Sequence, residues 1–315
     1  MTFPNPFARI VVGLDDSPPA AAALEVALTY AEQFGGEVRC VNASTAGATG
    51  VVRVTPDAPQ PDGTQFAQLD ERGRGLVEVL QKRVASRPIP ATLEFVAGGA
   101  AAAIVAVAER WEATAIVVGT HARGMLARAL AGSVAETTVR SARVPVVVVH
   151  EHTVARPLRR VLVGIDASDP SRKASTYATA LGATRSVRLA YCCAIDAASL
   201  LAPTADLPFD PTPLFAEMRL DARDALDAVV QEANAAGIYP DTEIVEVSDV
   251  ATGLVRVARQ RNADALVVGT HRRAPLQRFF VDSTAAAVLR ASEIPTIVVP
   301  GDAPIPARTE TAVAR

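Results

Sequence analysis

The chain has 315 residues, half of them hydrophobic, and a net charge of −3 at neutral pH. This length predicts two domains, and the charge excludes the basic surface typical of proteins that bind nucleic acid. Three cysteines are too few for a disulfide framework, and no signal peptide or membrane-spanning apolar stretch is evident. These properties favour a globular protein of the cytoplasm.

Three segments occur twice in the same order, about 150 residues apart. IVVGLDDS at 10–17 matches VLVGIDAS at 161–168, VVGTH at 117–121 recurs at 267–271, and VPVVVV at 144–149 matches IPTIVV at 294–299. Such a repeat predicts two homologous domains, at 1–150 and 158–300. A polar segment joins them, and 301–315 is predicted to be a disordered tail.

In the first half, strand and helix patterns alternate. Short β-branched runs predict strands at 9–14, 38–43, 91–96, 115–119 and 144–149. Helical spacing of apolar residues predicts helices at 18–34, 65–86, 101–111 and 133–141. Ser17 is suited to cap the first helix and Gly35 to end it. A loop rich in Pro and Gly is predicted at 44–63.

The second half repeats this alternation, with strands expected near 160–165, 186–192, 242–247, 264–269 and 295–299. Strands as apolar as AIVVG and PVVVV suit a parallel sheet that helices cover on both faces. The predicted fold class is therefore α/β, with two tandem doubly wound parallel five-stranded sheets. Cys40, Cys192 and Cys193 are interpreted as small apolar core residues.

Three features of the first half fall where ligands bind in an open α/β sheet, beyond the carboxyl ends of the strands. Asp15 follows the first strand, Gly119–His121 ends the fourth, and Gly132–Val134 opens the next helix. Amides at a helix N-terminus favour an anion, and glycines allow a backbone to approach phosphate oxygens closely. Asp15 is suited to accept from a ribose hydroxyl, and Arg123 and Arg128 are suited to offset phosphate charge.

Each of these features also has a purely structural interpretation. A glycine after a strand commonly forms a turn, Gly-Ser before a helix commonly forms a cap, and an aspartate at a strand end commonly caps the next helix. The chain has neither a P-loop nor a GxGxxG after its first strand. The residues alone therefore favour nothing more specific than a phosphate or nucleotide pocket in the first half.

Taken together, IVVGLDDS, VLVGIDAS, ADALVVGTH and GTHARGMLARALAGSVAETTVRSARVPVVVV resemble the universal stress protein family in its tandem-domain form. The resemblance covers nearly the whole chain. It implies an adenine-nucleotide α-hydrolase-like, Rossmann-like fold in each half, and two halves related by a pseudo-two-fold axis through pairing of their last strands. It also implies that ATP, accompanied by Mg²⁺, is the ligand.

Many members of the family bind ATP through Gly-x-x-Gly, nine further residues, and Gly followed by Ser or Thr. The first half departs from this pattern only at Ala122, which would cost about 1 kcal/mol if that position needs a positive φ. The resemblance places Asp15 and the backbone near Ala43 against adenosine. The residues that it implies for ATP are Gly13, Asp15, Ala43, Gly119, Thr120, His121, Ala122, Arg123, Gly124, Met125, Gly132, Ser133 and Val134.

The second half keeps VVGTH but has Arg272 and Asp282 at two of the glycine positions. Asp282 would bring a carboxylate to where a phosphate should approach, and like charges repel. We hypothesise that Arg272 pairs with Asp282 and closes this site. The shared VVGTH then serves strand and core in both halves, whereas the later glycines serve a ligand in the first half alone.

Several functions remain open at this point. The first is an ATP-binding stress-response or signalling protein, with an unknown protein partner and a homodimer as one assembly. The alternative is an interaction protein of the same fold that binds no nucleotide, which Ala122 favours. An adenylating enzyme is disfavoured because the turn after the first strand lacks glycine, and Asp16 is the one arguable base for slow ATP hydrolysis. His121 and His271 are interpreted as structural or phosphate-adjacent residues, not metal ligands.

Overall fold

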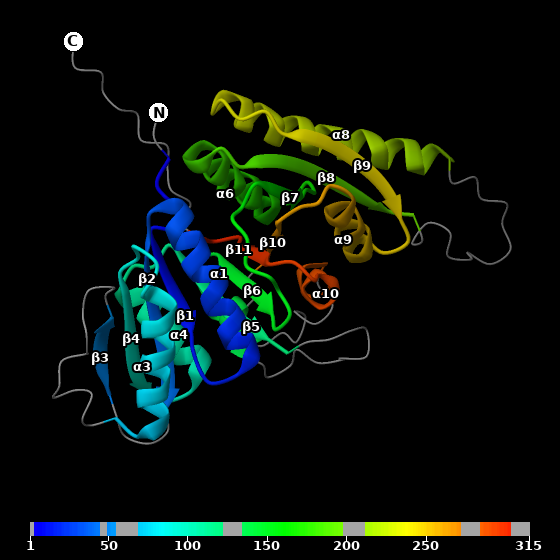
Figure 1. Cartoon of the computed structure of the whole chain (residues 1–315). Coiled ribbons are helices and arrows are strands. Elements are labelled where there is room, and N and C mark those ends of the chain that lie inside the picture. Colours follow the sequence, from blue (N-terminus) through cyan, green and yellow to red (C-terminus); the bar gives the residue numbers. More distant parts are fainter. Residues whose placement is uncertain are drawn as a thin grey trace, which may run out of the picture. The chain divides into compact units, whose positions relative to one another are not determined.

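The computed structural model describes residues 3–44, 49–54, 69–121, 134–197, 212–271 and 284–303. These residues form two compact units (Figure 1). The first unit consists mainly of Asn5–Leu158, and the second consists mainly of Arg159–Ser292 and the chain from Thr296 onward. Among the described helices, none combines the length and the apolar character needed to cross a bilayer.

The first unit is a twisted sheet with helices on both faces. Its strands are β1 (Arg9–Gly13), β2 (Glu37–Ser44), β3 (Gly50–Val54), β4 (Ala91–Ala97), β5 (Ala115–Thr120) and β6 (Val146–His150). Its helices are α1 (Pro18–Phe34), α3 (Glu71–Val84), α4 (Ala100–Arg110) and α5 (Val134–Ser141). The strand order is β3-β4-β2-β1-β5-β6. Strands after β1 are therefore added first on one side of it and then, from β5 onward, on the other side.

The extra strand β3 corrects the prediction of a loop over 44–63 and of five strands in this half. It pairs antiparallel with β4, and Val52 lies opposite Leu93. Val52 and Val54 are buried, whereas the residues between and before them are exposed. This alternation is the pattern of a strand with one buried face. The strand has only five residues and follows a segment rich in small residues, so the pattern is hard to recognise in the sequence.

Local capping explains where the helices begin and end. Ser17 caps α1, since its side chain accepts from Ala20 N, and Gly35 ends it in the left-handed conformation at φ 70°, as predicted. The helix predicted over 65–86 is α3, which begins at Glu71 because Asp70 accepts from Gly73 N at 2.7 Å.

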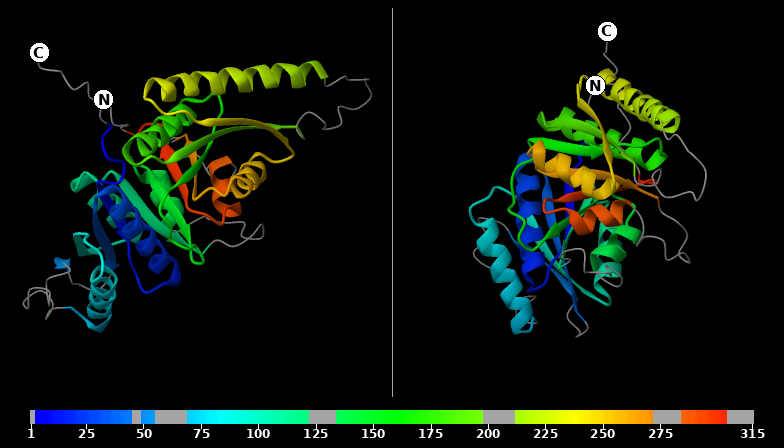
Figure 2. Two further views of the ribbon diagram at one scale, coloured as in Figure 1. Left: turned by 45° about the horizontal axis from the view of Figure 1, so that its top comes forward. Right: turned by 90° about the vertical axis from the view of Figure 1, so that its right-hand side faces the viewer.

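Right-handed crossovers distribute the helices over the two faces of the first sheet. α1 and α3 lie on one face (Figure 2), where Glu25 of α1 pairs with Arg83 of α3 and with Arg87, which follows that helix. α4 and α5 pack together on the other face. The central strand β1 is buried between these layers, and Ile10, Val11 and Val12 are 0% exposed.

The second unit has the predicted five-stranded parallel sheet. Its strands are β7 (Arg160–Gly164), β8 (Arg188–Asp196), β9 (Asp241–Val247), β10 (Ala265–Thr270) and β11 (Thr296–Pro300). Its helices are α6 (Asp169–Arg185), α8 (Thr212–Ala235), α9 (Val250–Gln260) and α10 (Thr284–Ala291). The order β9-β8-β7-β10-β11 reverses between β7 and β10, which confirms a doubly wound α/β fold in both halves.

The described start of the predicted tail is not disordered. Gly301 N donates to Thr270 O at 2.9 Å, and Lys173 Nζ donates to Ala303 O at 3.2 Å. Ala303 is 2% exposed. Residues 301–303 therefore belong to the packed second unit, and 304–315 lie outside the described residues.

Candidate functional site

The carboxyl ends of β1, β2 and β5 meet at one edge of the first sheet, beside the point where strand order reverses. β1 ends at Gly13, which lies opposite Val41 of β2, and β5 ends at Gly119 and Thr120. Ala43 lies near the end of β2, and Asp15 follows β1. The structure thus brings these predicted residues to the edge where α/β sheets bind ligands.

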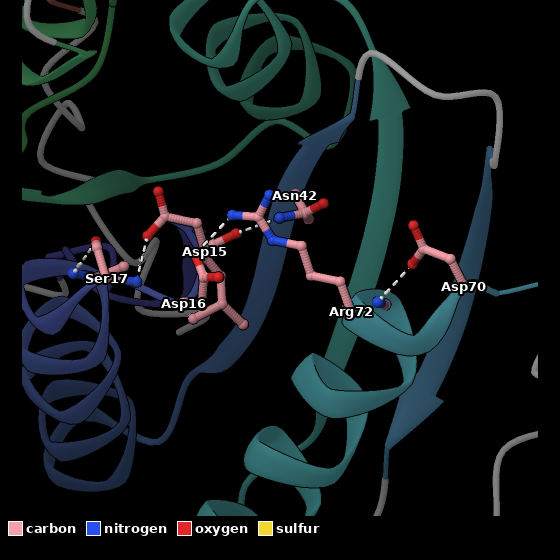
Figure 3. A network of polar contacts seen from close by, with 9 residues as sticks. Asp15, Asp16, Ser17, Asn42, Asp70 and Arg72 are labelled. Carbon is pink, nitrogen blue, oxygen red and sulfur yellow. Dashed lines mark hydrogen bonds and ion pairs between the residues drawn. The ribbon is translucent and has the colours of Figure 1, made fainter.

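The turn from β1 to α1 is shaped by the side chain of Asp15 (Figure 3). Asp15 Oδ1 accepts from Ser17 N at 2.9 Å, and Ser17 Oγ accepts from Ala20 N at 3.3 Å. Asn42 Nδ2 donates to Leu14 O at 2.8 Å and so ties β2 to the end of β1. One oxygen of Asp15 therefore holds the turn, which agrees with the structural interpretation of this residue.

An ion pair links the same turn to the start of α3. Arg72 Nη2 lies 2.6 Å from Asp16 Oδ1, and both side chains are about two-thirds exposed (Figure 3). The hydrogen bond from Arg72 lowers the pKa of Asp16 below its ordinary value of 3.8. A lower pKa makes the carboxylate a weaker base, so this pairing disfavours Asp16 as the base of ATP hydrolysis. Sequence reasoning did not identify Arg72, which is 56 residues away in the chain.

Packing explains why both halves keep the glycine of VVGTH. A Cβ atom on Gly119 would lie 2.3 Å from the carbonyl carbon and oxygen of Pro19. A Cβ atom on Gly269 would lie 2.3 Å from the same atoms of Pro170. The end of the strand thus meets the first turn of a helix at backbone distance in each unit, whether or not a ligand binds there.

Packing also explains the glycine at position 13, but here the neighbouring atom belongs to a side chain and not to the backbone. A Cβ atom there would lie 2.6 Å from Ile104 Cδ1, the end of a side chain that can turn aside. Thr120, at the end of β5, is buried. Val134 begins α5 and is 40% exposed.

His121 lies on the outside of the first unit, immediately after β5. Its Nδ1 is 3.6 Å from Glu151 Oε2, and His152 Nε2 is 3.2 Å from Glu151 Oε1. Both imidazoles are largely exposed. Within the described ranges, no group of three or more His, Cys, Asp or Glu side chains is arranged to hold a metal ion.

The remaining predicted residues lie outside the described part of the chain. They are Ala122, Arg123, Gly124, Met125, Arg128, Gly132 and Ser133. Arg272 and Asp282, which we hypothesised to pair in the second half, also lie outside it.

The second unit has a cavity of about 380 Å³ at the corresponding edge of its sheet. Gly164, Asp166 and Ser168 line it, and these match Gly13, Asp15 and Ser17 of the first unit. Asp166 Oδ1 accepts from Ser168 N at 2.8 Å, the same turn as in the first unit. Sequence reasoning did not predict this cavity, because its lining comes from seven helices and strands that no local pattern connects.

Comparisons with known proteins agree with this architecture. The model of the universal stress protein family matches residues 6–150 and again 157–300. A universal stress protein of Mycobacterium tuberculosis is 32% identical over 309 residues, covering 95% of this chain and 99% of the relative. The crystal structure of a universal stress protein from Archaeoglobus fulgidus shares the fold, with a TM-score of 0.66 at 18% identity over 95% of this chain and 100% of that chain.

Two other solved universal stress proteins were determined as nucleotide complexes. One, from Archaeoglobus fulgidus, contains dAMP and is 16% identical, with a TM-score of 0.33 over 45% of this chain and 97% of that chain. Another contains cAMP and is 25% identical, with a TM-score of 0.32 over 46% of this chain and 98% of that chain. These ligands are observations on those two proteins.

Proposed function

Because the chain belongs to the universal stress protein family, we propose that its first unit binds ATP and that occupancy of this site is read by a protein partner in a stress response. The second unit, in this proposal, binds no nucleotide. In this proposal the protein acts by binding and not as an enzyme, and the hydrogen bond from Arg72 makes Asp16 a weaker base for ATP hydrolysis.

The observation that carries the proposal is the group of residues at the carboxyl edge of the first unit's sheet, where the strand order reverses. Gly13, Asp15, Ala43 and Thr120 gather there from β1, β2 and β5, and the edge also carries the guanidinium of Arg72. Asp15 has a second oxygen that its hydrogen bond to Ser17 N does not use, which suits a ribose hydroxyl. The N-terminus of α5 follows β5 in the chain and suits a phosphate.

In the proposed site, the chain's own residues would hold ATP and its Mg²⁺ in distinct ways. Asp15 and the backbone at Ala43 would contact adenosine, and 119–125 with 132–134 would surround the phosphates. Mg²⁺ would offset phosphate charge when it accompanies ATP. The cytoplasm is the proposed compartment, because all three cysteines are free and buried, and a homodimer is the proposed assembly.

The first experiment is to denature the purified protein and to quantify released nucleotides by mass spectrometry. We expect about one ATP per chain. Two per chain would contradict a silent second unit. No nucleotide, together with no binding of added ATP and Mg²⁺, would contradict the proposal and favour the nucleotide-independent interaction protein.

Two matched variants then locate the site. Each variant removes a carboxylate that holds a turn. Asp15 accepts from Ser17 N, and Asp166 accepts from Ser168 N. We expect Asp15→Ala to lower ATP affinity about tenfold, as the loss of a charged hydrogen bond does, and Asp166→Ala to leave it unchanged. Equal losses in both variants would show that the turn matters through stability and not through contact with ATP.

A further inference from the structure

The cavity of the second unit has largely apolar walls. Met218 and Ala225 contribute from α8, Leu254 from α9 and Val268 from β10. Its volume of about 380 Å³ is that of a small-molecule site, in which apolar walls are combined with a few polar groups. The apolar part of a ligand would therefore be accommodated inside.

A buried thiol also faces this cavity. Cys193 lines it and is 7% exposed. Burial raises the pKa of this thiol to about 11, so the thiol is protonated and neutral at neutral pH. Cys193 thus contributes a polar atom that a ligand can contact, and it differs from Cys40 and Cys192, which are 0% exposed.

The charged residues among the described part of the cavity lining all have the same sign. Asp166 comes from the turn after β7, Asp196 from the end of β8, and Asp221 from α8. None of the described residues that line the cavity is a lysine, an arginine or a histidine. Carboxylates around an apolar cavity raise the local concentration of cations and lower that of anions.

The position of Asp221 can be compared directly with the first unit. The buried residues of α8 follow the same spacing as those of α3, with Ala222 corresponding to Gly73 and Leu226 to Val77. Asp221 therefore corresponds to Arg72. The partner of Arg72 is Asp16, and its counterpart after β7 is Ala167. The ion pair of the first unit is thus replaced by a single carboxylate in the cavity wall.

We propose that the cavity of the second unit binds a small organic cation, namely an ammonium group carried on an apolar body. The apolar body would lie against Met218 and Leu254, and the ammonium group would lie near Asp221 and Asp166. A phosphate-bearing ligand is disfavoured at the same wall by like charge. This inference does not depend on ATP binding in the first unit.

The test uses three probes of one shape and different charge: 2-phenylethylamine, 2-phenylethanol and phenylacetate. Binding to the full chain is measured by calorimetry, and the site is located by protection of Cys193 from N-ethylmaleimide at pH 8, read by peptide mass spectrometry. We expect the amine to bind about tenfold more tightly than the acid, with the alcohol between them. The amine, but not ATP, is expected to slow the labelling of Cys193.

Two variants on α8 sharpen the test. Asp221→Arg should weaken amine binding and allow phenylacetate to protect Cys193, whereas Asp221→Asn should weaken amine binding about threefold. Asp224→Asn is the matched control, because Asp224 is exposed on the same helix but does not line the cavity. Its amine binding should equal that of the unchanged protein.

Several outcomes would overturn the inference. These are phenylacetate binding as tightly as the amine, ATP protecting Cys193 as well as the amine does, or no binding of the amine up to about 10 mM. ATP binding that is lost in Asp15→Ala would stand whatever the amine does, so failure here is distinguishable from failure of the proposed function.

Discussion

The two units build the same sheet edge from matching backbone but place different charges on it. In each, an aspartate after the first strand accepts from the amide two residues later, and a glycine near the end of β5 or β10 meets the first turn of a helix. At the helix beside this edge, Arg72 of the first unit corresponds to Asp221 of the second. The comparison teaches that the shared scaffold and the charge placed on it are carried by different residues.

A second difference between the units lies on β4 and β9, the parallel strands beside β2 and β8. Glu94 on β4 contacts Arg110 and Arg39, and its side chain is 9% exposed. Glu243, at the same register position on β9, lies 2.7 Å from Arg261 and its side chain is 32% exposed. β3 covers β4 in the first unit, whereas β9 is the outermost described strand of the second. The same type of pair is therefore buried in one unit and partly solvated in the other.

The largest expected effect tests the shared scaffold. Gly119→Ala and Gly269→Ala should each lower the free energy of unfolding by about 3 kcal/mol, because the added Cβ meets a proline carbonyl in both units. Urea unfolding measures the loss. Gly75→Ala is the control, since nothing lies within 4 Å of its Cβ position in α3, and it should stabilise slightly. If only one of the two variants lost stability, the two units would not share this packing requirement.

The next effect tests the difference made by β3. Glu94→Gln should cost about 2 kcal/mol, because it leaves Arg39 and Arg110 without a carboxylate at a buried position. Glu243→Gln should cost about 0.5 kcal/mol, since water screens the more exposed pair. Thermal unfolding of the two variants compares them directly. Equal costs would mean that cover by β3 does not decide the strength of the pair.

A smaller effect concerns the ends of α1 and α6. Gly35 ends α1 at φ 70°, whereas Ser186 ends α6 at φ 54°, a conformation that costs a side chain about 1 kcal/mol. Ser186→Gly should therefore stabilise the second unit by about that amount, and Gly35→Ser should destabilise the first similarly. Chemical denaturation is the measurement, and a destabilising Ser186→Gly would contradict this account.

The smallest effect is a shift in titration. In Arg72→Ala, the pKa of Asp16 should rise towards 3.8, because the hydrogen bond that lowers it is lost. The stability due to this pair is present above pH 4 and is lost as pH falls through the lowered pKa, since the unfolded state then binds the proton more tightly. Carboxyl NMR of Asp16 follows the titration. An unchanged pKa would show that Arg72 does not hold Asp16 in solution.

Local signals in the sequence predicted much of the fold. The repeat at VVGTH and the apolar strands predicted two doubly wound units, and Ser17 and Gly35 predicted the ends of α1. β3 was missed because Gly50–Val54 is short and half exposed. Such a strand forms because it pairs with β4, and no local sequence pattern predicts that pairing.

The candidate site was predictable only at the strand ends. Gly13, Asp15 and Gly119 follow or end apolar strands, so the fold class alone brings them to one edge. The pairing of Arg72 with Asp16, and the cavity between α8, α9 and β8, depend on how helices pack across the sheet. Side chains so far apart in the chain meet only in three dimensions.

The outermost position of β9 has a consequence for the behaviour of the protein at high concentration. An outer strand offers backbone groups to which another molecule can add a strand, the usual first step of aggregation. β9 carries Asp241, Glu243 and Glu246, and Arg261 and Arg219 hold these carboxylates. A second copy approaching this strand would have to displace ordered charge on both sides. Where β9 ends the described sheet of the second unit, these charges therefore favour resistance to self-association in a crowded cell.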